Sequence, residues 1–135
     1  PPALDWAGVA SALRLYLEET RERFGLGYEL ENRLDEEPSG AVRLNVYRIA
    51  QEAITNVRKH AEASRVEVAL ASRDDGVLVT IRDDGHGVDA AADARSFGLA
   101  SMRERAESAG GWWRIESRPH AGTTVEFWVP AAAGI

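Results

Sequence analysis

The stretch of residues 77–87 places a carboxylate where a ligand could reach it. Side chains alternate along a strand, so Asp83 shares one face with three apolar residues, Val77, Val79 and Ile81. This face is predicted to be buried, and an inward-pointing Asp83 needs hydrogen-bond donors. Gly85 and Gly87 follow at once and let the backbone bend or approach a flat partner closely. Asp83 could accept a hydrogen bond from a ligand amine; the alternative is that Asp-Asp-Gly is only a turn after a strand.

A second group of chemically capable residues lies on a predicted helix, residues 41–61. Its apolar residues recur with the helical period and form a broad buried face: Val42, Val46, Ile49, Ala50, Ala53, Ile54, Val57 and Ala61. Glu52, Asn56, Lys59 and His60 follow one flank of that face. This flank is either a solvated helix edge or a site for Mg²⁺ and phosphate, since Mg²⁺ prefers oxygen ligands and phosphates attract cations.

A third predicted helix opens with Gly98 and Leu99 and ends before Gly110. Free backbone N–H groups at such a start could bind an anion, although an ordinary helix start fits equally. The preceding loop, residues 84–97, shows no clear period, and loops of this length in compact domains are typically functional lids. We assign no role to three polar residues of this loop, Asp93, Arg95 and Ser96.

Thr123 repeats the pattern of Asp83 on another predicted strand. It shares a face with three apolar residues, Val125, Phe127 and Val129, so a polar side chain again reaches the buried side, here at the start of the strand. The alternative is a core threonine whose hydroxyl is bonded to backbone.

The elements that must position these residues follow from periodicity and turn residues. Helices are predicted over residues 5–24 (capped by Asp5, with Phe24 on the apolar stripe), 41–61 and 98–109. Strands are predicted over residues 28–34, 65–72, 77–83, 112–117 and 123–129, with a hairpin turn at 73–76. This order predicts one α/β (α+β) domain over residues 1–135, a two-layer sandwich. Its sheet is mixed, largely antiparallel and of about five strands, with the helices on one face.

Composition excludes several classes of function. The 135 residues carry a net charge of −6, which argues against a protein that coats nucleic acid. There are no cysteines and three scattered histidines, so thiolate chemistry and a protein-built transition-metal site are not expected. The sequence holds no apolar run of membrane-span length, no P-loop, no Rossmann glycine pattern and no nucleophile elbow. It reads as a domain excised from a longer protein.

Four segments resemble the motifs of one superfamily. Residues 48–61 resemble the N box of the GHKL ATPases, and residues 83–87 match their Asp-x-Gly-x-Gly box. Residues 97–106 match the next glycine-led segment, and residues 122–125 match the closing Gly-Thr motif. Order and spacing agree over nearly the whole chain. The sequence most resembles the ATP-binding catalytic domain of sensor histidine kinases that pair with NarL/LuxR-like response regulators, which implies a Bergerat-type ATP-binding fold.

The resemblance implies a role for each matched residue. Asp83 would accept the adenine amino group, Thr123 would support that contact, and Gly85 and Gly87 would leave room for the base. Asn56 would ligate Mg²⁺, with Glu52 acting through water or polarising the phosphate acceptor. The remaining matched residues would face the phosphates: Lys59, His60, Gly98 and Leu99.

The implied function is to bind ATP with Mg²⁺ and to donate the γ-phosphate to a histidine in two-component signalling. None of the chain's histidines, His60, His86 and His120, lies on a helix with a dimerisation pattern, so the acceptor is expected on an upstream dimerisation domain. The parent would be a cytoplasmic homodimer, or the cytoplasmic part of a membrane-bound sensor, and would act on a response regulator. This fragment would be a monomer, inactive in autophosphorylation, without membrane or nucleic-acid contact. The alternatives are a GHKL-type ATPase, an anti-sigma-factor-like serine kinase, and a non-catalytic nucleotide-binding docking module.

Overall fold

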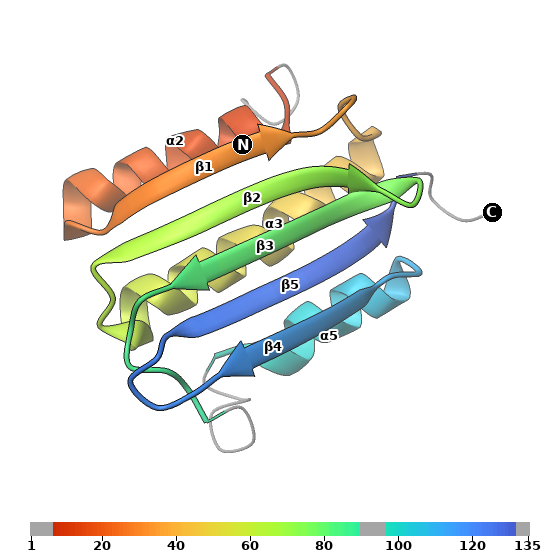
Figure 1. The fold of residues 1–135 in the computed structure, drawn as a ribbon. Helices are drawn as coiled ribbons and strands as arrows, with labels where there is room; N and C mark the ends of the chain where they lie inside the picture. The colour runs from red at the N-terminus through yellow and green to blue at the C-terminus, as the bar shows by residue number, and fades with distance from the viewer. Residues whose placement is uncertain (1–6, 90–96, 132–135) are drawn as a thin grey trace.

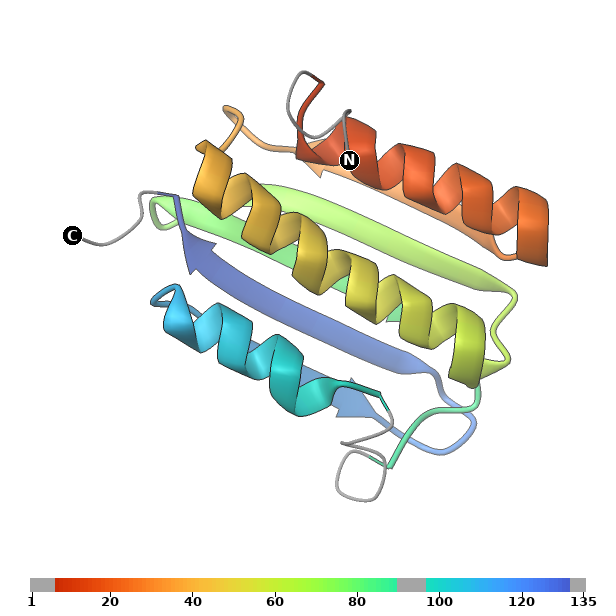
Figure 2. The same ribbon diagram turned by 180° about the vertical axis from the view of Figure 1, so that it is seen from behind.

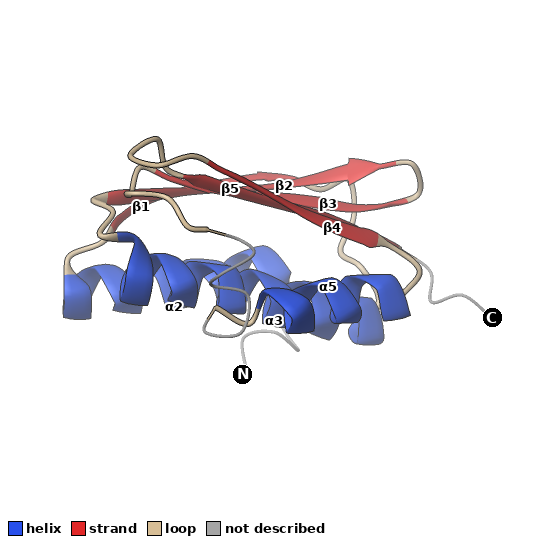
Figure 3. Cartoon of the chain, turned by 90° about the horizontal axis from the view of Figure 1, so that it is seen from below, coloured by secondary structure: helices blue, strands red, loops and turns tan. Residues whose placement is uncertain are grey.

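A sheet and a layer of helices make up the chain. The computed structural model describes residues 7–89 and 97–131. Figure 1 shows the strands in front with the helices behind them, Figure 2 shows the helix layer from the other side, and Figure 3 shows the two layers edge-on. The predicted two-layer sandwich, with a mixed five-stranded sheet covered on one face, is confirmed.

The strands lie in the order β1-β2-β3-β5-β4. Their bounds are Gly27–Arg33 (β1), Arg65–Arg73 (β2), Gly76–Asp83 (β3), Trp112–Ser117 (β4) and Thr123–Pro130 (β5). β1 pairs with β2 in parallel, because a helix crosses over between them, and the other pairs are antiparallel. β3 and β5 are neighbours in the sheet, and β3 ends at Asp83 where β5 begins at Thr123, the two polar residues singled out by strand alternation.

The turn between β2 and β3 follows the predicted hairpin chemistry. Asp74 and Asp75 both have positive φ, 50° and 57°. Positive φ at both central residues gives a two-residue turn whose twist matches that of the strands it joins. This turn fixes the register in which Val66 faces Asp83 at the opposite end of the ladder.

The helical layer consists of α2 (Val9–Phe24), α3 (Gly40–Asn56), a π-helical segment η1 (Val57–Ala61) and α5 (Leu99–Ser108). The predicted apolar faces of α3 and of the strands meet in one core. Its most deeply buried large side chains are Phe127, Leu13, Leu17, Ile49, Ile54, Leu70, Ile81 and Met102. Among the described residues, no helix is both long and apolar enough to span a bilayer.

The first helix ends at Phe24 as predicted, but it differs from the prediction at its start and in the burial of its last residue. The predicted cap, Asp5, lies outside the described residues, and α2 begins at Val9, whose N–H donates to Glu37 Oε1 at 2.7 Å. The prediction that Phe24 lies on the buried stripe is wrong, because its side chain is 53% exposed. The Arg58 guanidinium lies 4.3 Å from the Phe24 ring centre, a cation–π contact from a distant segment that the helical period of α2 cannot predict.

The predicted helix over residues 41–61 is not one regular α-helix. It is α-helical to Asn56 and then widens into the π-helical η1. A π-helical turn takes up more residues than an α-turn and re-aims the side chains that follow. The directions of Lys59 and His60 therefore do not follow from the helical wheel that places Glu52 and Asn56.

Candidate functional site

A narrow cavity lies between the end of α3 and the ends of β3, β5 and β4. Its volume is only about 20 Å³. Three polar side chains line it: Asn56, Asp83 and Thr123. The rest of its wall is apolar: Ala53, Val57, Ala61, Ile81, Val88, Phe97, Leu99, Ile115 and Val125. The cavity thus combines an apolar interior with a few convergent polar groups, which is the composition of small-molecule sites.

Asp83 ends β3 with its carboxylate turned into the protein. The residue is 7% exposed, as strand alternation predicts, and its Oδ1 accepts a hydrogen bond from the Gly85 N–H at 2.8 Å. Burial raises the pKa of this carboxyl, and the backbone N–H groups of Gly85 and Thr123 offset part of that rise. A carboxylate held in such surroundings gains from any further donor that enters the cavity.

Thr123 faces Asp83 across the sheet. The two residues are register partners on β5 and β3, so their side chains enter the cavity next to each other. Thr123 Oγ1 lies 2.8 Å from Ser117 Oγ, and Ser117 Oγ also accepts from the Val88 N–H at 2.8 Å. We did not predict a role for Ser117. The signal was present, because Ser117 is another polar residue at the end of a strand face that otherwise carries Trp113 and Ile115.

Asn56, the last residue of α3, contacts the other side of the cavity. Its Nδ2 donates to the Phe97 carbonyl oxygen at 2.5 Å. The Phe97 ring stacks on the His60 imidazole, with ring centres 4.3 Å apart and planes at 19°. Phe97 is thereby held by two of the predicted site residues. Sequence reasoning gave Phe97 no role, because a lone aromatic residue after an irregular loop carries no periodic signal.

Glu52 and Gly98 also come together. Gly98 is the N-cap of α5 with φ of 63°, and a Cβ at this position would lie 2.5 Å from Glu52 Oε1. The Glu52 carboxylate therefore rests against the N-terminus of α5, where backbone N–H groups and the helix dipole favour negative charge. The backbone amides of Gly98 and Leu99 open this helix, as predicted, and the Leu99 side chain lines the cavity.

Gly85 and Gly87 are close to the cavity, but the space they leave is filled by protein. A Cβ on Gly85 would lie 2.2 Å from the Ala61 carbonyl oxygen. A Cβ on Gly87, which has φ of 85°, would lie 2.3 Å from the Arg118 carbonyl oxygen. In this structure the glycines allow backbone to approach backbone, whereas the resemblance implied that they leave room for a base.

Apart from Gly85 and Gly87, the predicted residues fall into three groups. Asn56, Asp83, Thr123 and Leu99 line the cavity. Glu52, Gly98 and His60 contact one another or Phe97 at its edge. Lys59 is exposed on η1 and does not line the cavity.

Comparison with known proteins assigns this arrangement to a family. Residues 41–133 match the family model described as histidine kinase-, DNA gyrase B- and HSP90-like ATPase. The chain belongs to this family. The match covers α3, the cavity and every strand except β1.

Curated relatives of this ATPase domain are sensor kinases. The chain is 33% identical over 130 residues to the signal transduction histidine-protein kinase/phosphatase DegS of Brevibacillus brevis, a match over 95% of this chain. It is 36% identical to the kinase/phosphatase UhpB of Salmonella typhimurium over 96% of its length. It is 37% identical to the nitrate/nitrite sensor protein NarX of Escherichia coli over 87%. The matched segment spans only 34%, 26% and 20% of these relatives, in that order.

Solved structures agree on the fold. The ATPase domain superposes on the histidine kinase domain of the Erythrobacter litoralis blue-light activated kinase EL346 with a TM-score of 0.74 and 18% identity, over 92% of this chain and 61% of that one. It superposes on the histidine kinase AdeS of Acinetobacter baumannii with a TM-score of 0.72 and 15% identity, over 91% of this chain and 63% of that one.

Proposed function

We propose that this domain binds Mg–ATP and donates the γ-phosphate to a histidine on a dimerisation domain upstream of it, in two-component signalling. The observation that carries the proposal is the buried Asp83 carboxylate, which faces one cavity together with Asn56 at the end of α3. Asp83 can accept a hydrogen bond from a nucleotide base, and the Asn56 amide oxygen on the opposite wall can bind a metal ion. This pair suits a ligand with a base at one end and phosphates at the other.

The base half of the site is built on β3 and β5. Asp83 would accept a hydrogen bond from the exocyclic amine of adenine, and Thr123, its register partner on β5, would lie beside the same edge of the ring. The apolar walls formed by Ile81 and Val125 would contact the faces of the base. A buried carboxylate selects a ligand with an N–H donor at this position, because an acceptor there would repel it.

The phosphate half of the site is built on the end of α3 and the start of α5. A carbonyl oxygen can only accept a hydrogen bond, so Asn56 must turn its Nδ2 toward Phe97 and keep its Oδ1 free for a cation. Mg²⁺ fits such a site, because it is commonly held by one or two protein oxygens together with substrate phosphates. When bound, Mg²⁺ would neutralise charge on the phosphates. Lys59, His60 and the amides at Gly98 would lie on the phosphate side, with Glu52 beside them.

Entry of a nucleotide requires the cavity to open. A volume of about 20 Å³ holds roughly one water molecule and is far too small for a purine. The Phe97 ring and carbonyl, held by His60 and Asn56, form the part of the wall that belongs to the predicted lid loop, residues 84–97. We therefore propose that nucleotide binding separates Phe97 from Asn56.

The phosphate acceptor is expected outside this chain. His60 stacks on Phe97, His86 Nδ1 lies 2.6 Å from the Gly87 carbonyl oxygen, and His120 sits in a turn with φ of 61°. None lies on an exposed helix face that could be offered to a second active site. We propose that the complete protein is a cytoplasmic or membrane-bound homodimer whose phosphohistidine serves a NarL/LuxR-type response regulator, and that this domain alone is monomeric.

Calorimetric titration with ATP, with and without Mg²⁺, tests the binding proposal. We expect Asp83→Asn to abolish measurable ATP binding, because its side-chain amide has one acceptor oxygen where the carboxylate has two. The matched control is Asp75→Asn, in the hairpin turn that precedes β3, which should bind like wild type. An Asp83→Asn protein that binds ATP as tightly as wild type would overturn the proposal.

Transfer is tested separately on a longer chain. Adding back the upstream helical segment should give Mg–ATP-dependent, acid-labile phosphohistidine, whereas this domain alone should give none. ATP hydrolysis without phosphohistidine in the longer chain would instead favour an ATPase.

A further inference from the structure

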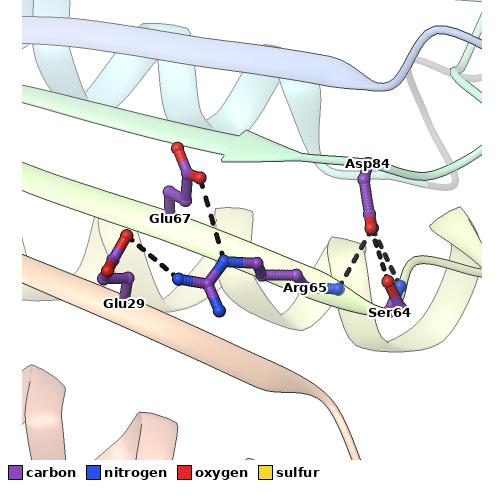
Figure 4. Close-up of polar contacts among 5 residues, drawn as sticks. All are labelled: Glu29, Ser64, Arg65, Glu67 and Asp84. Carbon is purple, nitrogen blue, oxygen red and sulfur yellow. Dashed lines mark hydrogen bonds and ion pairs between the residues drawn. The ribbon is translucent and has the colours of Figure 1, made fainter.

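Asp84 directly follows β3 and makes three hydrogen bonds outside the cavity. Its Oδ1 accepts from the backbone N–H groups of Ser64 at 2.8 Å and Arg65 at 3.0 Å, and its Oδ2 accepts from Ser64 Oγ at 2.5 Å (Figure 4). The Ser64 hydroxyl is the largest cause of the lowered pKa of this carboxyl, so Asp84 is a carboxylate at neutral pH. It is exposed and does not line the cavity.

These bonds continue the sheet beyond its last backbone pair. The β2–β3 ladder ends at Val66 opposite Asp83. One residue further along, the Asp84 side chain accepts from the N–H groups of Ser64 and of Arg65, the first residue of β2. Arg65 is also held from its other end, because its guanidinium contacts Glu29 at 3.0 Å and Glu67 at 3.8 Å (Figure 4).

The segment that Asp84 holds comes directly from η1. Ala61 ends η1, which carries Lys59 and His60, and only two residues separate it from Ser64. The loop after Asp84 fastens to the same place, because the His86 N–H donates to the Ala61 carbonyl oxygen at 2.9 Å and Gly85 packs against that oxygen. Contacts of residues 84–86 with residues 61–65 therefore tie the end of β3 to the end of the helix.

We propose that Asp84 is a positioning residue that fixes the distance between the base half and the phosphate half of the site. The inference rests on the proposed function, since Asp83 stands at one end of the connection and Asn56, Lys59 and His60 stand at the other. Asp84 does not line the cavity, so it would touch neither half of the ligand. Asp84 should therefore affect the binding only of ligands that span both halves, because only these ligands need a fixed distance between the two walls of the cavity.

The test compares two ligands on the same variants. Mg–ATP spans both halves, whereas adenosine carries the base and ribose alone. We expect Asp84→Ala to weaken Mg–ATP binding about tenfold and adenosine binding by less than about twofold, because a small displacement of one binding group costs a spanning ligand most. Dissociation constants from calorimetry for Mg–ATP and from NMR titration for adenosine give this ratio.

Two further variants separate positioning from folding. Asp84→Asn keeps an oxygen that can accept from the Ser64 and Arg65 N–H groups. We expect its ratio of dissociation constants, Mg–ATP to adenosine, to lie within about twofold of the wild-type ratio. Ser64→Ala removes only the hydroxyl bond and should shift the ratio in the same direction as Asp84→Ala, by a smaller factor. These two variants decide the question if Asp84→Ala does not fold.

Glu37→Ala is the matched control for lost stability. It removes a carboxylate that accepts from the Val9 N–H and pairs with Arg43, far from the cavity, and it should leave the ratio unchanged. If Asp84→Ala weakens the binding of Mg–ATP and of adenosine by the same factor, or weakens neither, the positioning role is overturned. Wild-type protein that binds neither ligand overturns the proposed function instead.

Discussion

The side-chain Nδ2 of Asn56 donates to the backbone carbonyl oxygen of Phe97 at 2.5 Å, and this bond determines how the Asn56 amide is turned. Phe97 directly precedes the N-cap of α5. The bond therefore connects the end of one helix to the start of another across the mouth of the cavity. It also leaves Asn56 Oδ1 as the side-chain atom of this residue that can meet a cation.

Asn56→Ala should weaken Mg–ATP binding about tenfold, because the variant lacks the amide oxygen that would meet the cation. Binding of ATP without Mg²⁺ should change much less, since the amide oxygen acts through the metal. Paired calorimetric titrations with and without Mg²⁺ measure both effects.

Asn45→Ala is the control for this change. Asn45 lies on the same helix and donates to the Arg105 carbonyl oxygen at 3.2 Å, outside the cavity. Equal losses in the two variants, or a loss in Asn56→Ala that does not depend on Mg²⁺, would show that Asn56 is not a metal ligand.

Asp83→Asn should make the ligand-free protein more stable at neutral pH. Burial raises the folded-state pKa of Asp83 above its ordinary value of 3.8, so the group favours folding below that value and this contribution is lost as pH rises through the raised pKa. The permanently neutral asparagine avoids the loss. The stability difference between variant and wild type should therefore grow from acidic to neutral pH.

Thermal unfolding at a series of pH values measures this difference. Asp75→Asn should run parallel to wild type, because Asp75 is exposed in the hairpin. An Asp83→Asn protein less stable than wild type at neutral pH would mean that the hydrogen bonds to Asp83 outweigh its burial.

Thr123→Val should reduce ATP affinity by about threefold to tenfold and cost the fold no more than about 1 kcal/mol. Ser117 keeps its bonds to Val88 and to the Gly122 carbonyl oxygen when the Thr123 hydroxyl is lost, so no buried group is left without a partner. Titration and urea unfolding separate the two effects. Thr124→Val, one residue on and on the opposite face of β5, should leave ATP affinity unchanged.

Gly85→Ala should destabilise the domain by about 2–4 kcal/mol, because its Cβ would meet the backbone of Ala61, which cannot move aside as a side chain could. Gly40→Ala is the matched control. Nothing lies within 4 Å of a Cβ there, and Gly40 opens α3. The alanine should be neutral or stabilise the domain by up to about 1 kcal/mol, which urea unfolding measures.

Strand alternation and turn chemistry are local properties, so the sequence by itself determined the features that depend on them. The period of two brings Asp83 and Thr123 inward because each shares its strand face with a run of apolar residues. The Asp-Asp turn sets the hairpin register because both residues adopt positive φ. The start of α5 at Leu99 follows from Gly98 in the same way.

Tertiary contacts decided what these periods could not. The π-helical turn after Asn56 re-aims His60 toward Phe97, and no residue type marks such a turn. A glycine is needed at position 85 because a side chain there would meet the Ala61 carbonyl oxygen at the end of η1. The Asp84 carboxylate accepts from the N–H groups of Ser64 and Arg65 at the start of β2. These partners are all distant in sequence. A local period reports which way a side chain points from its own backbone. The partner it meets depends on how distant segments pack, and packing is a property of the whole chain.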